Sequence, residues 1–167
     1  FTIMSFTSVK TMRHHVRLRY QQQAPYQGLL FKSTNWESLP PEALGIFANA
    51  FENSGIVLPR VWLEAEDRTR STPIPVRFGD RIQDARGLVG LSPRETLLSA
   101  ADGLLIGGRW FRANERRAVL LPDRMAGSLG IDPRRPEGAV VLLWGVPYRV
   151  VGVFSGAKLM DRVDLDG

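Results

Sequence analysis

The sequence predicts an α+β fold, in which a mixed α/β lobe is followed by a β-rich lobe. Three observations support this class: the apolar content, a strand-helix-strand succession upstream, and a hairpin pattern near the C-terminal end. The chain has 167 residues, of which 44% are hydrophobic, so it can bury a core as one domain or as two small lobes. This composition argues against overall disorder.

Charge and cysteine content limit the function classes. The 22 Lys and Arg residues exceed the 17 Asp and Glu residues and give a net charge of +5, which favours acidic partners or an anionic surface. The charge is spread along the chain and does not indicate one partner. Cysteine is absent, which excludes disulfides, thiolate zinc sites and a cysteine nucleophile and leaves the redox compartment open.

The first nine residues carry no charge, and Lys10, Arg13, Arg17 and Arg19 follow them. This run is about half of the roughly 20 apolar residues that span a bilayer. The residues alone fit equally the cut end of a membrane helix and an edge strand of a soluble domain. The basic flank favours the cytoplasmic side, which argues against an extracytoplasmic location.

The upstream lobe is expected to begin with a strand over residues 28–34 and a helix of about three turns. Ser38 stands at the N-cap position before two prolines and a glutamate, and apolar residues recur at helical spacing over residues 43–51. Residues 53–55 end this helix, and residues 56–63, which contain a proline, predict an edge strand. The succession indicates a βαβ-like unit.

Charged and polar residues over 64–72 predict a loop or an exposed hairpin end, and residues 74–78 predict a short strand. Downstream, residues 92–95 combine an N-cap serine, a proline and a glutamate three residues after the cap. This capping box predicts a short helix over residues 93–100. The glycines that follow are interpreted as turn residues: Gly103, Gly107 and Gly108.

The C-terminal third alternates strands with one helix. Residues 118–121 predict a buried strand, and a helix is expected to open at Pro122 and to end at Gly130. Two further strands, 139–144 and 148–154, flank a turn at residues 145–147.

Four segments appear in a characteristic order: Gly87 to Ser92, Leu105 to Phe111, Ala118 to Leu121 with Ala126, Leu129 and Gly130, and Pro147 to Phe154. This order resembles the MacB-like periplasmic core domain, which lies between transmembrane helices of FtsX-type ABC transporter permeases. In that family a glycine-arginine-aromatic turn precedes a strand and a short helix, and a strand ending in a Val-Val-Gly-Val-like run closes the hairpin. Each segment alone is unspecific, and the ordered set carries the resemblance.

The resemblance implies a membrane-proximal stub over residues 1–24, a porter-like α/β lobe over 25–86 and a β-rich lobe over 87–167, truncated relative to the family. It implies a non-catalytic domain of a permease in the bacterial inner membrane, located in the periplasm. The domain would transmit ATPase-driven motion to a periplasmic partner protein or an exported substrate. Its other implied partners are the transmembrane part of the same permease, a separate ATP-binding subunit or domain, and a second copy in a dimer.

No catalytic, cofactor-binding, metal-binding or partner-binding residue is assigned from the sequence, and no cofactor is expected. His14 and His15 are adjacent and share no face of a helix or strand, which argues against a metal site. The glycines lack the spacing of a phosphate-binding loop or a Rossmann fingerprint, and Ser92 is assigned to capping. Two acidic groups are interpreted as solvated loop charges: Glu64, Glu66 and Asp67, and Asp161, Asp164 and Asp166. The chain is therefore predicted not to be an enzyme.

The main alternative is a basic nucleic-acid-binding module. Residues 13–20 interleave basic and aromatic groups, as a strand that contacts phosphates and stacks on bases would. No recognised nucleic-acid motif accompanies them, and a solvated strand face or a flank on anionic lipid explains them too. In a purely structural interaction domain, exposed tryptophans would anchor an interface: Trp36, Trp62, Trp110 and Trp144. Of these, Trp110 and Trp144 are predicted to pack in the core.

Overall fold

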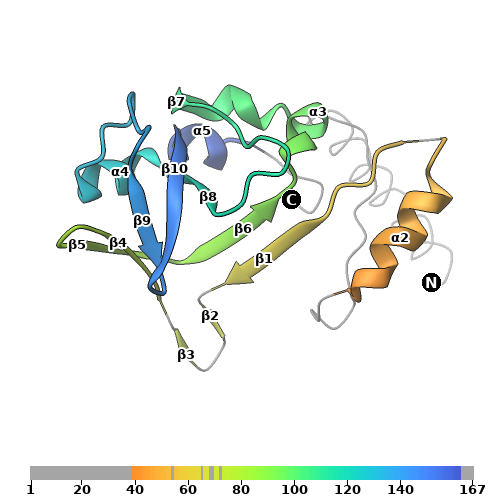
Figure 1. Ribbon diagram of the computed structural model, residues 1–167, viewed down its shortest axis with the longest axis horizontal. Coiled ribbons are helices and arrows are strands. Elements are labelled where there is room, and N and C mark those ends of the chain that lie inside the picture. Colours follow the sequence, from red (N-terminus) through yellow and green to blue (C-terminus); the bar gives the residue numbers. More distant parts are fainter. Residues whose placement is uncertain (1–38, 54, 65, 68–69, 72, 163–167) are drawn as a thin grey trace, which may run out of the picture.

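The structure, a computed structural model, describes residues 39–53, 55–64, 66–67, 70–71 and 73–162. Within these residues it contains four α-helices and three β-sheets (Figure 1). This arrangement confirms the predicted α+β class. The strand expected over residues 28–34 lies outside the described residues.

The largest sheet has six strands, in the order β5-β4-β9-β10-β7 with β8 beside β10. Its strands are β4 (Ile74–Phe78), β5 (Arg81–Ala85), β7 (Leu105–Gly108), β8 (Ala118–Pro122), β9 (Val140–Leu143) and β10 (Val146–Phe154). The long β10 runs antiparallel to β9 and β7 and parallel to β8. Residues 150–153 of β10 are all buried, which explains their continuous apolar run.

The helix α4 (Asp123–Leu129) covers the core beside this sheet and contacts β5, β8 and β10. Pro122 is its N-cap, and it ends at Gly130 with a φ of 79°, as the sequence predicted. Ala126 and Leu129, three residues apart, are buried against strand residues such as Val141, because residues at this spacing share one helix face. The other core residues of this cluster are Val76, Leu121, Ile131, Leu143, Val150 and Val153.

The hairpin of β9 and β10 is confirmed, but its turn differs from the predicted one. Leu143 pairs directly with Val146, so the turn consists of Trp144 and Gly145 and β10 begins at Val146. Both turn residues have positive φ, 48° and 81°, as a two-residue type I′ turn requires. Asn, Asp and Gly are the residues usually found in such turns, and a tryptophan there is strained.

We expect Trp144→Asn to raise the free energy of unfolding by about 1 kcal/mol, because asparagine tolerates the left-handed conformation that costs other residues about 1–2 kcal/mol. Urea unfolding of both proteins measures the difference. Trp144→Phe keeps the strain and serves as the control. An unchanged or lower stability of the asparagine variant would contradict the strain argument.

A separate two-stranded ribbon joins β1 (Arg60–Glu64) to β6 (Gly87–Leu91). The strand expected over residues 56–63 therefore begins only after Pro59. Val61, Trp62 and Leu63 are all exposed, so this ribbon shows apolar side chains on both of its faces. Two further short strands, β2 (Glu66–Asp67) and β3 (Arg70–Ser71), pair with each other and confirm that this segment contains a hairpin.

The helix α2 (Pro41–Ala50) confirms the predicted upstream helix. Its N-cap is Pro40, so the prediction of Ser38 as the cap is wrong; Ser38 itself lies outside the described residues. None of the α2 residues is buried, although the sequence predicted one apolar face. That face therefore contributes little to the core.

The short-helix region comprises η1 (Pro93–Glu95), α3 (Thr96–Ser99) and η2 (Ala101–Leu104), and α5 (Gly156–Met160) follows β10. The Ser92 hydroxyl accepts a hydrogen bond from the Arg94 N–H, which confirms the cap. Glu95 does not complete a capping box: its buried carboxylate binds the Arg60 guanidinium at 2.6 Å. Arg162 donates to the carbonyls of Ser99 and Ala100, which ties the segment directly after α5 to the end of α3.

Sheet membership does not follow the expected lobe boundary at residues 86 and 87. Strands β4 and β5, upstream of it, belong to the sheet of β9 and β10, whereas β6, downstream of it, pairs with β1. The lobe division stays a prediction. Among the described residues, no helix has the length and apolar character needed to cross a membrane.

Candidate functional site

Many of the residues weighed for chemistry from the sequence lie outside the part of the chain that the structure describes. His14, His15 and the basic-aromatic segment 13–20 lie outside the described residues, as do Asp164 and Asp166. Asp161 is an exposed residue at the end of α5, and Glu64 is in β1 while Glu66 and Asp67 form β2. Within the described part of the chain, no three His, Cys, Asp or Glu residues are placed to hold a metal ion.

Gly107 and Gly108 were interpreted as turn residues, but they belong to β7 and pair with β10. They are needed because other backbone lies against them. A Cβ on Gly107 would lie 2.7 Å from the Arg134 carbonyl carbon and Cα and would also overlap the Pro133 carbonyl oxygen. A Cβ on Gly108 would lie 2.6 Å from Gly152 Cα. These glycines therefore serve close packing, not ligand binding.

The loop between β7 and β8, residues 109–117, is the candidate functional site, and hydrogen bonds to β10 fix both of its ends. β10 holds it at both ends, because the Arg109 N–H donates to the Val151 carbonyl and the Arg149 N–H donates to the Arg117 carbonyl, each at 2.8 Å. Asn114 and Arg117 have φ of 62° and 52°. Both residues therefore adopt the left-handed conformation, which is uncommon for residues other than glycine.

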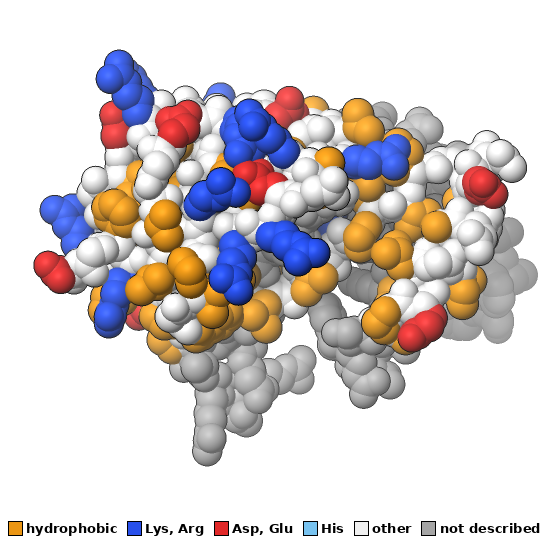
Figure 2. Space-filling model, viewed as in Figure 1, with side chains coloured by type: hydrophobic (Ala, Val, Ile, Leu, Met, Phe, Trp, Pro, Cys, Tyr) orange, Lys and Arg blue, Asp and Glu red, His pale blue; other side chains and the backbone are white. Residues whose placement is uncertain are grey.

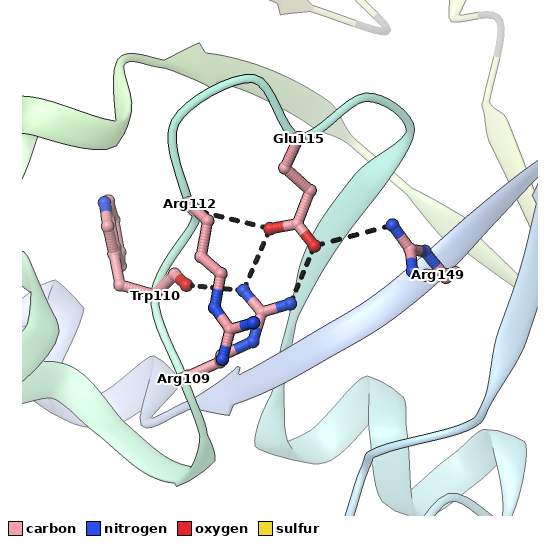
Figure 3. Close-up of polar contacts among 5 residues, drawn as sticks. All are labelled: Arg109, Trp110, Arg112, Glu115 and Arg149. Atoms are coloured by element: carbon pink, nitrogen blue, oxygen red, sulfur yellow. Dashed lines mark hydrogen bonds and ion pairs between the residues drawn. The ribbon is translucent and has the colours of Figure 1, made fainter.

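Glu115 organises the loop from its centre (Figure 3). Its carboxylate accepts two hydrogen bonds from the Arg109 guanidinium, at 2.7 and 2.9 Å, and one from the Arg112 N–H at 3.1 Å. Arg149 lies 3.6 Å away on β10. The Glu115 side chain is 7% exposed and that of Arg149 is 65% exposed, so the paired carboxylate lies beneath an accessible cation.

These contacts shift two pKa values in opposite directions. The hydrogen bonds from Arg109 lower the pKa of Glu115 to about 2, against the opposing effect of burial, with the Arg112 N–H and the Arg149 charge acting in the same direction as Arg109. The same pairing raises the pKa of Arg109. The carboxylate thus stays ionised at all physiological pH values.

We expect the stabilisation from Glu115 to be lost in acid. Because its folded-state pKa lies below the ordinary value of 4.5, the stabilisation is complete above pH 4.5 and disappears as the pH falls towards 2. Glu115→Gln should therefore have a free energy of unfolding about 2 kcal/mol lower than wild type at neutral pH. This figure is reduced for solvent screening, because Arg149 is exposed and Arg109 partly so. Thermal melting of both proteins across this range should show the two curves converging. A constant difference down to pH 2 would contradict this assignment.

Four exposed arginines surround Glu115 or continue from it: Arg112, Arg116, Arg117 and Arg149, which we term the arginine surface. Figure 2 shows basic side chains gathered around an acidic one over the β7–β8 loop and β10. Hydrophobic side chains gather over the end of the β9–β10 hairpin in the same view (Figure 2). The arrangement can bind anionic groups.

The sequence did not predict this cluster. The arginines of the loop were noted only as a glycine-arginine-aromatic turn, and Glu115 was not considered. The signal available was a glutamate enclosed by basic residues on both sides over 109–117. That pattern allows an ion pair within the loop, whereas the position of Arg149 beside Glu115 requires the fold.

The burial of the tryptophans differs from the prediction. Trp144 is 53% exposed, so the expectation that it packs in the core is wrong; its turn position directs it to the surface. Trp110 is half-buried and lies edge-to-face against Phe111, with ring centroids 5.2 Å apart. Trp62 is 57% exposed on β1, and Trp36 lies outside the described residues.

Comparison with known proteins identifies the fold. Neither a known protein family nor a curated protein matches the sequence. Among solved structures, the chain is similar to the periplasmic region of MacB from Actinobacillus actinomycetemcomitans, with a TM-score of 0.56 and 17% sequence identity. The match covers 84% of this chain and 65% of that one, so the chain spans 65% of the length of the structure it matches. The chain shares this fold, which confirms, at the level of fold, the resemblance seen in the sequence.

Proposed function

We propose that the chain is an extracytoplasmic domain of an ABC transporter permease, which transmits ATPase-driven motion to a periplasmic partner protein or an exported substrate. The observation that carries this proposal is the shared fold with the MacB periplasmic region over 84% of the chain. Fold alone does not determine function. The ordered segments of residues 87–154 add independent support from the sequence.

The proposal has further parts, which concern location, lobes and partners. The domain is placed in the periplasm at the bacterial inner membrane, after a membrane-proximal stub over residues 1–24, with a porter-like lobe over 25–86 and a β-rich lobe over 87–167. Its partners are the transmembrane part of the same permease, a separate ATP-binding subunit or domain, and a second copy in a dimer. It has no chemistry of its own and no cofactor, because ATP hydrolysis belongs to the ATP-binding partner.

Location is tested by thiol labelling in intact cells. Because the 167 residues contain no cysteine, Asp102→Cys at an exposed position introduces one defined thiol into this domain of the full-length protein. We expect a membrane-impermeant maleimide to label it before lysis, whereas the unsubstituted protein shows the background. Labelling that requires lysis and inner-membrane disruption would contradict an extracytoplasmic location.

Motion is tested separately on the purified full-length protein. Spin labels on the Asp102→Cys thiols of two copies report the distance between the domains of the proposed dimer. We expect this distance to change between ATP-bound and nucleotide-free states. An unchanged distance in a preparation that hydrolyses ATP would contradict the transmission of motion, and the location would be unaffected.

A basic nucleic-acid-binding module is the second candidate, because the arginine surface offers exposed cations beside each other. Single-stranded binding would weaken steeply with salt, with a slope of about −0.7 in log K per phosphate contact. Titration of an oligothymidylate at several salt concentrations measures this slope. Negligible binding at physiological ionic strength, about 0.15 M, would remove this candidate.

A further inference from the structure

We infer that the arginine surface and the Trp144 turn form one docking surface for an acidic protein segment that also presents an apolar side chain. The inference goes beyond the proposed function, since it concerns the surface of this chain and stands whether or not the chain belongs to a permease. It rests on the unpaired charge of the arginine surface, on the combination of arginines with a tryptophan, and on the apolar turn close to these arginines.

The charge of the arginine surface is not neutralised within the described residues. Glu115 already receives two hydrogen bonds from Arg109 and one from the Arg112 N–H. Its contact with the arginine surface is Arg149 at 3.6 Å. Among described residues, the guanidinium groups of Arg112, Arg116 and Arg117 form no ion pair. The exposed Glu137 acts on Arg109 and forms no ion pair with these groups either.

The combination of arginines with an exposed tryptophan favours a protein partner. All four members are arginines, whose planar guanidinium binds a carboxylate through two parallel hydrogen bonds. Arginine and tryptophan are enriched at the energetic centres of protein interfaces, and lysine is depleted there. Arginine binds phosphate groups in the same bidentate way, so it is the neighbourhood of an exposed tryptophan that favours a protein partner over a phosphate backbone.

Exposed apolar side chains lie on the β9–β10 hairpin, which also carries Arg149. Trp144 and Val140 are each at least 44% exposed. Val146, which pairs with the buried Leu143, lies on the other face of the strand from Arg149. Val140 is the pairing partner of Arg149, so an apolar and a basic side chain lie side by side on one face. Arg149 follows Val146 by three residues, which is about 10 Å along a strand. One partner segment of modest length can therefore contact both the turn and the arginine surface.

The strain at Trp144 points to the same surface. A bulky residue at a φ of 48° costs stability that asparagine or glycine would not. Such strain concentrates at binding sites, where the exposed side chain has a use. Trp144 is the aromatic anchor of the docking surface, and the arginines set the charge of what it accepts.

The test uses a defined probe, a fluorescently labelled random copolymer of glutamate and tyrosine, titrated into the full chain at about 0.15 M ionic strength. Polyglutamate, oligothymidylate and vesicles containing phosphatidylglycerol are titrated in parallel. We expect the glutamate–tyrosine copolymer to bind more tightly than polyglutamate, because it adds an aromatic contact, and more tightly than the other two.

Matched variants separate this surface from general charge. Arg112→Glu with Arg116→Glu should weaken binding of the copolymer by about tenfold or more, and Trp144→Ser by about threefold or more. Arg94→Glu with Arg124→Glu changes the net charge equally at exposed positions elsewhere, and Trp62→Ser removes another exposed tryptophan. Both controls should leave the affinity within about twofold.

Four outcomes would overturn the inference. Equal weakening by the control arginine pair would show that net charge alone binds the probe, and equal affinity for polyglutamate would remove the apolar contact. Tighter binding of oligothymidylate or of the vesicles would assign the surface to a nucleic acid or to a membrane. If the variant Arg112→Glu with Arg116→Glu lost its cooperative melting transition, Arg112→Gln with Arg116→Gln would give the same comparison without charge reversal.

Discussion

Gly107→Ala is expected to lower the free energy of unfolding by about 3 kcal/mol or more, the upper part of the range for an overpacked interior. The added methyl group would meet backbone, namely the Pro133 carbonyl oxygen and, at 2.7 Å, the carbonyl carbon and Cα of Arg134. Backbone cannot rotate away as a flexible side chain can. Either β7 must leave β10 or the segment after Ile131 must move.

Urea unfolding measures this cost, and Gly127→Ala is the matched control. Gly127 lies in α4, and a Cβ there would have no atom within 4 Å. Alanine in the interior of a helix is favoured over glycine by about 0.5–1 kcal/mol. The same substitution should therefore destabilise the protein at position 107 and stabilise it at position 127. Equal effects at both positions would show that the close approach around Gly107 is not a constraint.

The elements that the sequence predicted well are those with local signals. The run at residues 150–153 is apolar because it is buried, whereas the run at 118–121, predicted to be a buried strand, forms a strand in which only Leu121 is buried. The helix α4 is bounded by Pro122 and Gly130, which mark helix ends through their own backbone restrictions. The ordered family segments contain these same elements. The fold class followed from such local features.

The strands that the sequence missed lack a local signal. β5 is exposed along most of its length and has no apolar alternation, because it lies at the sheet edge. β6 contains glycines at 87 and 90, which weaken strand propensity. The pairing of Val76 with Leu143 joins distant parts of the chain, and no local pattern contains that information.

The candidate site depended on long-range contacts in the same way. The serine-proline-arginine-glutamate pattern at 92–95 correctly predicted the cap, but the partner of Glu95 is Arg60, 35 residues away. Likewise, the arginine surface needs Arg149 of β10 beside the loop that Glu115 holds. Trp144 was assigned to the core because its strand is apolar, and its exposure follows from the turn that Gly145 completes.

Arg60→Ala is expected to destabilise the protein by about 3–5 kcal/mol, the range for a buried ion pair that loses one partner. The Glu95 side chain is 2% exposed and binds Arg60 at 2.6 Å, while its second oxygen, Oε2, has no hydrogen-bond partner among the described residues. Without Arg60, the buried carboxylate would lose this charged partner. This pair connects β1 to η1, so we expect the β1–β6 ribbon to loosen first.

A double variant tests whether the cost arises from the orphaned carboxylate. Arg60→Met with Glu95→Leu replaces both charges by apolar groups of similar size, and such replacements of buried pairs are often neutral or stabilising. We expect it to be clearly more stable than Arg60→Ala in urea unfolding. Arg94→Ala, an exposed neighbour, should change stability by no more than about 0.5 kcal/mol. Hydrogen exchange should show faster exchange at the amides that the β1–β6 ladder protects in Arg60→Ala and wild-type rates in the double variant. If the double variant were as unstable as Arg60→Ala, the pair would act through packing of the arginine stem, and the buried charge would not be the cause.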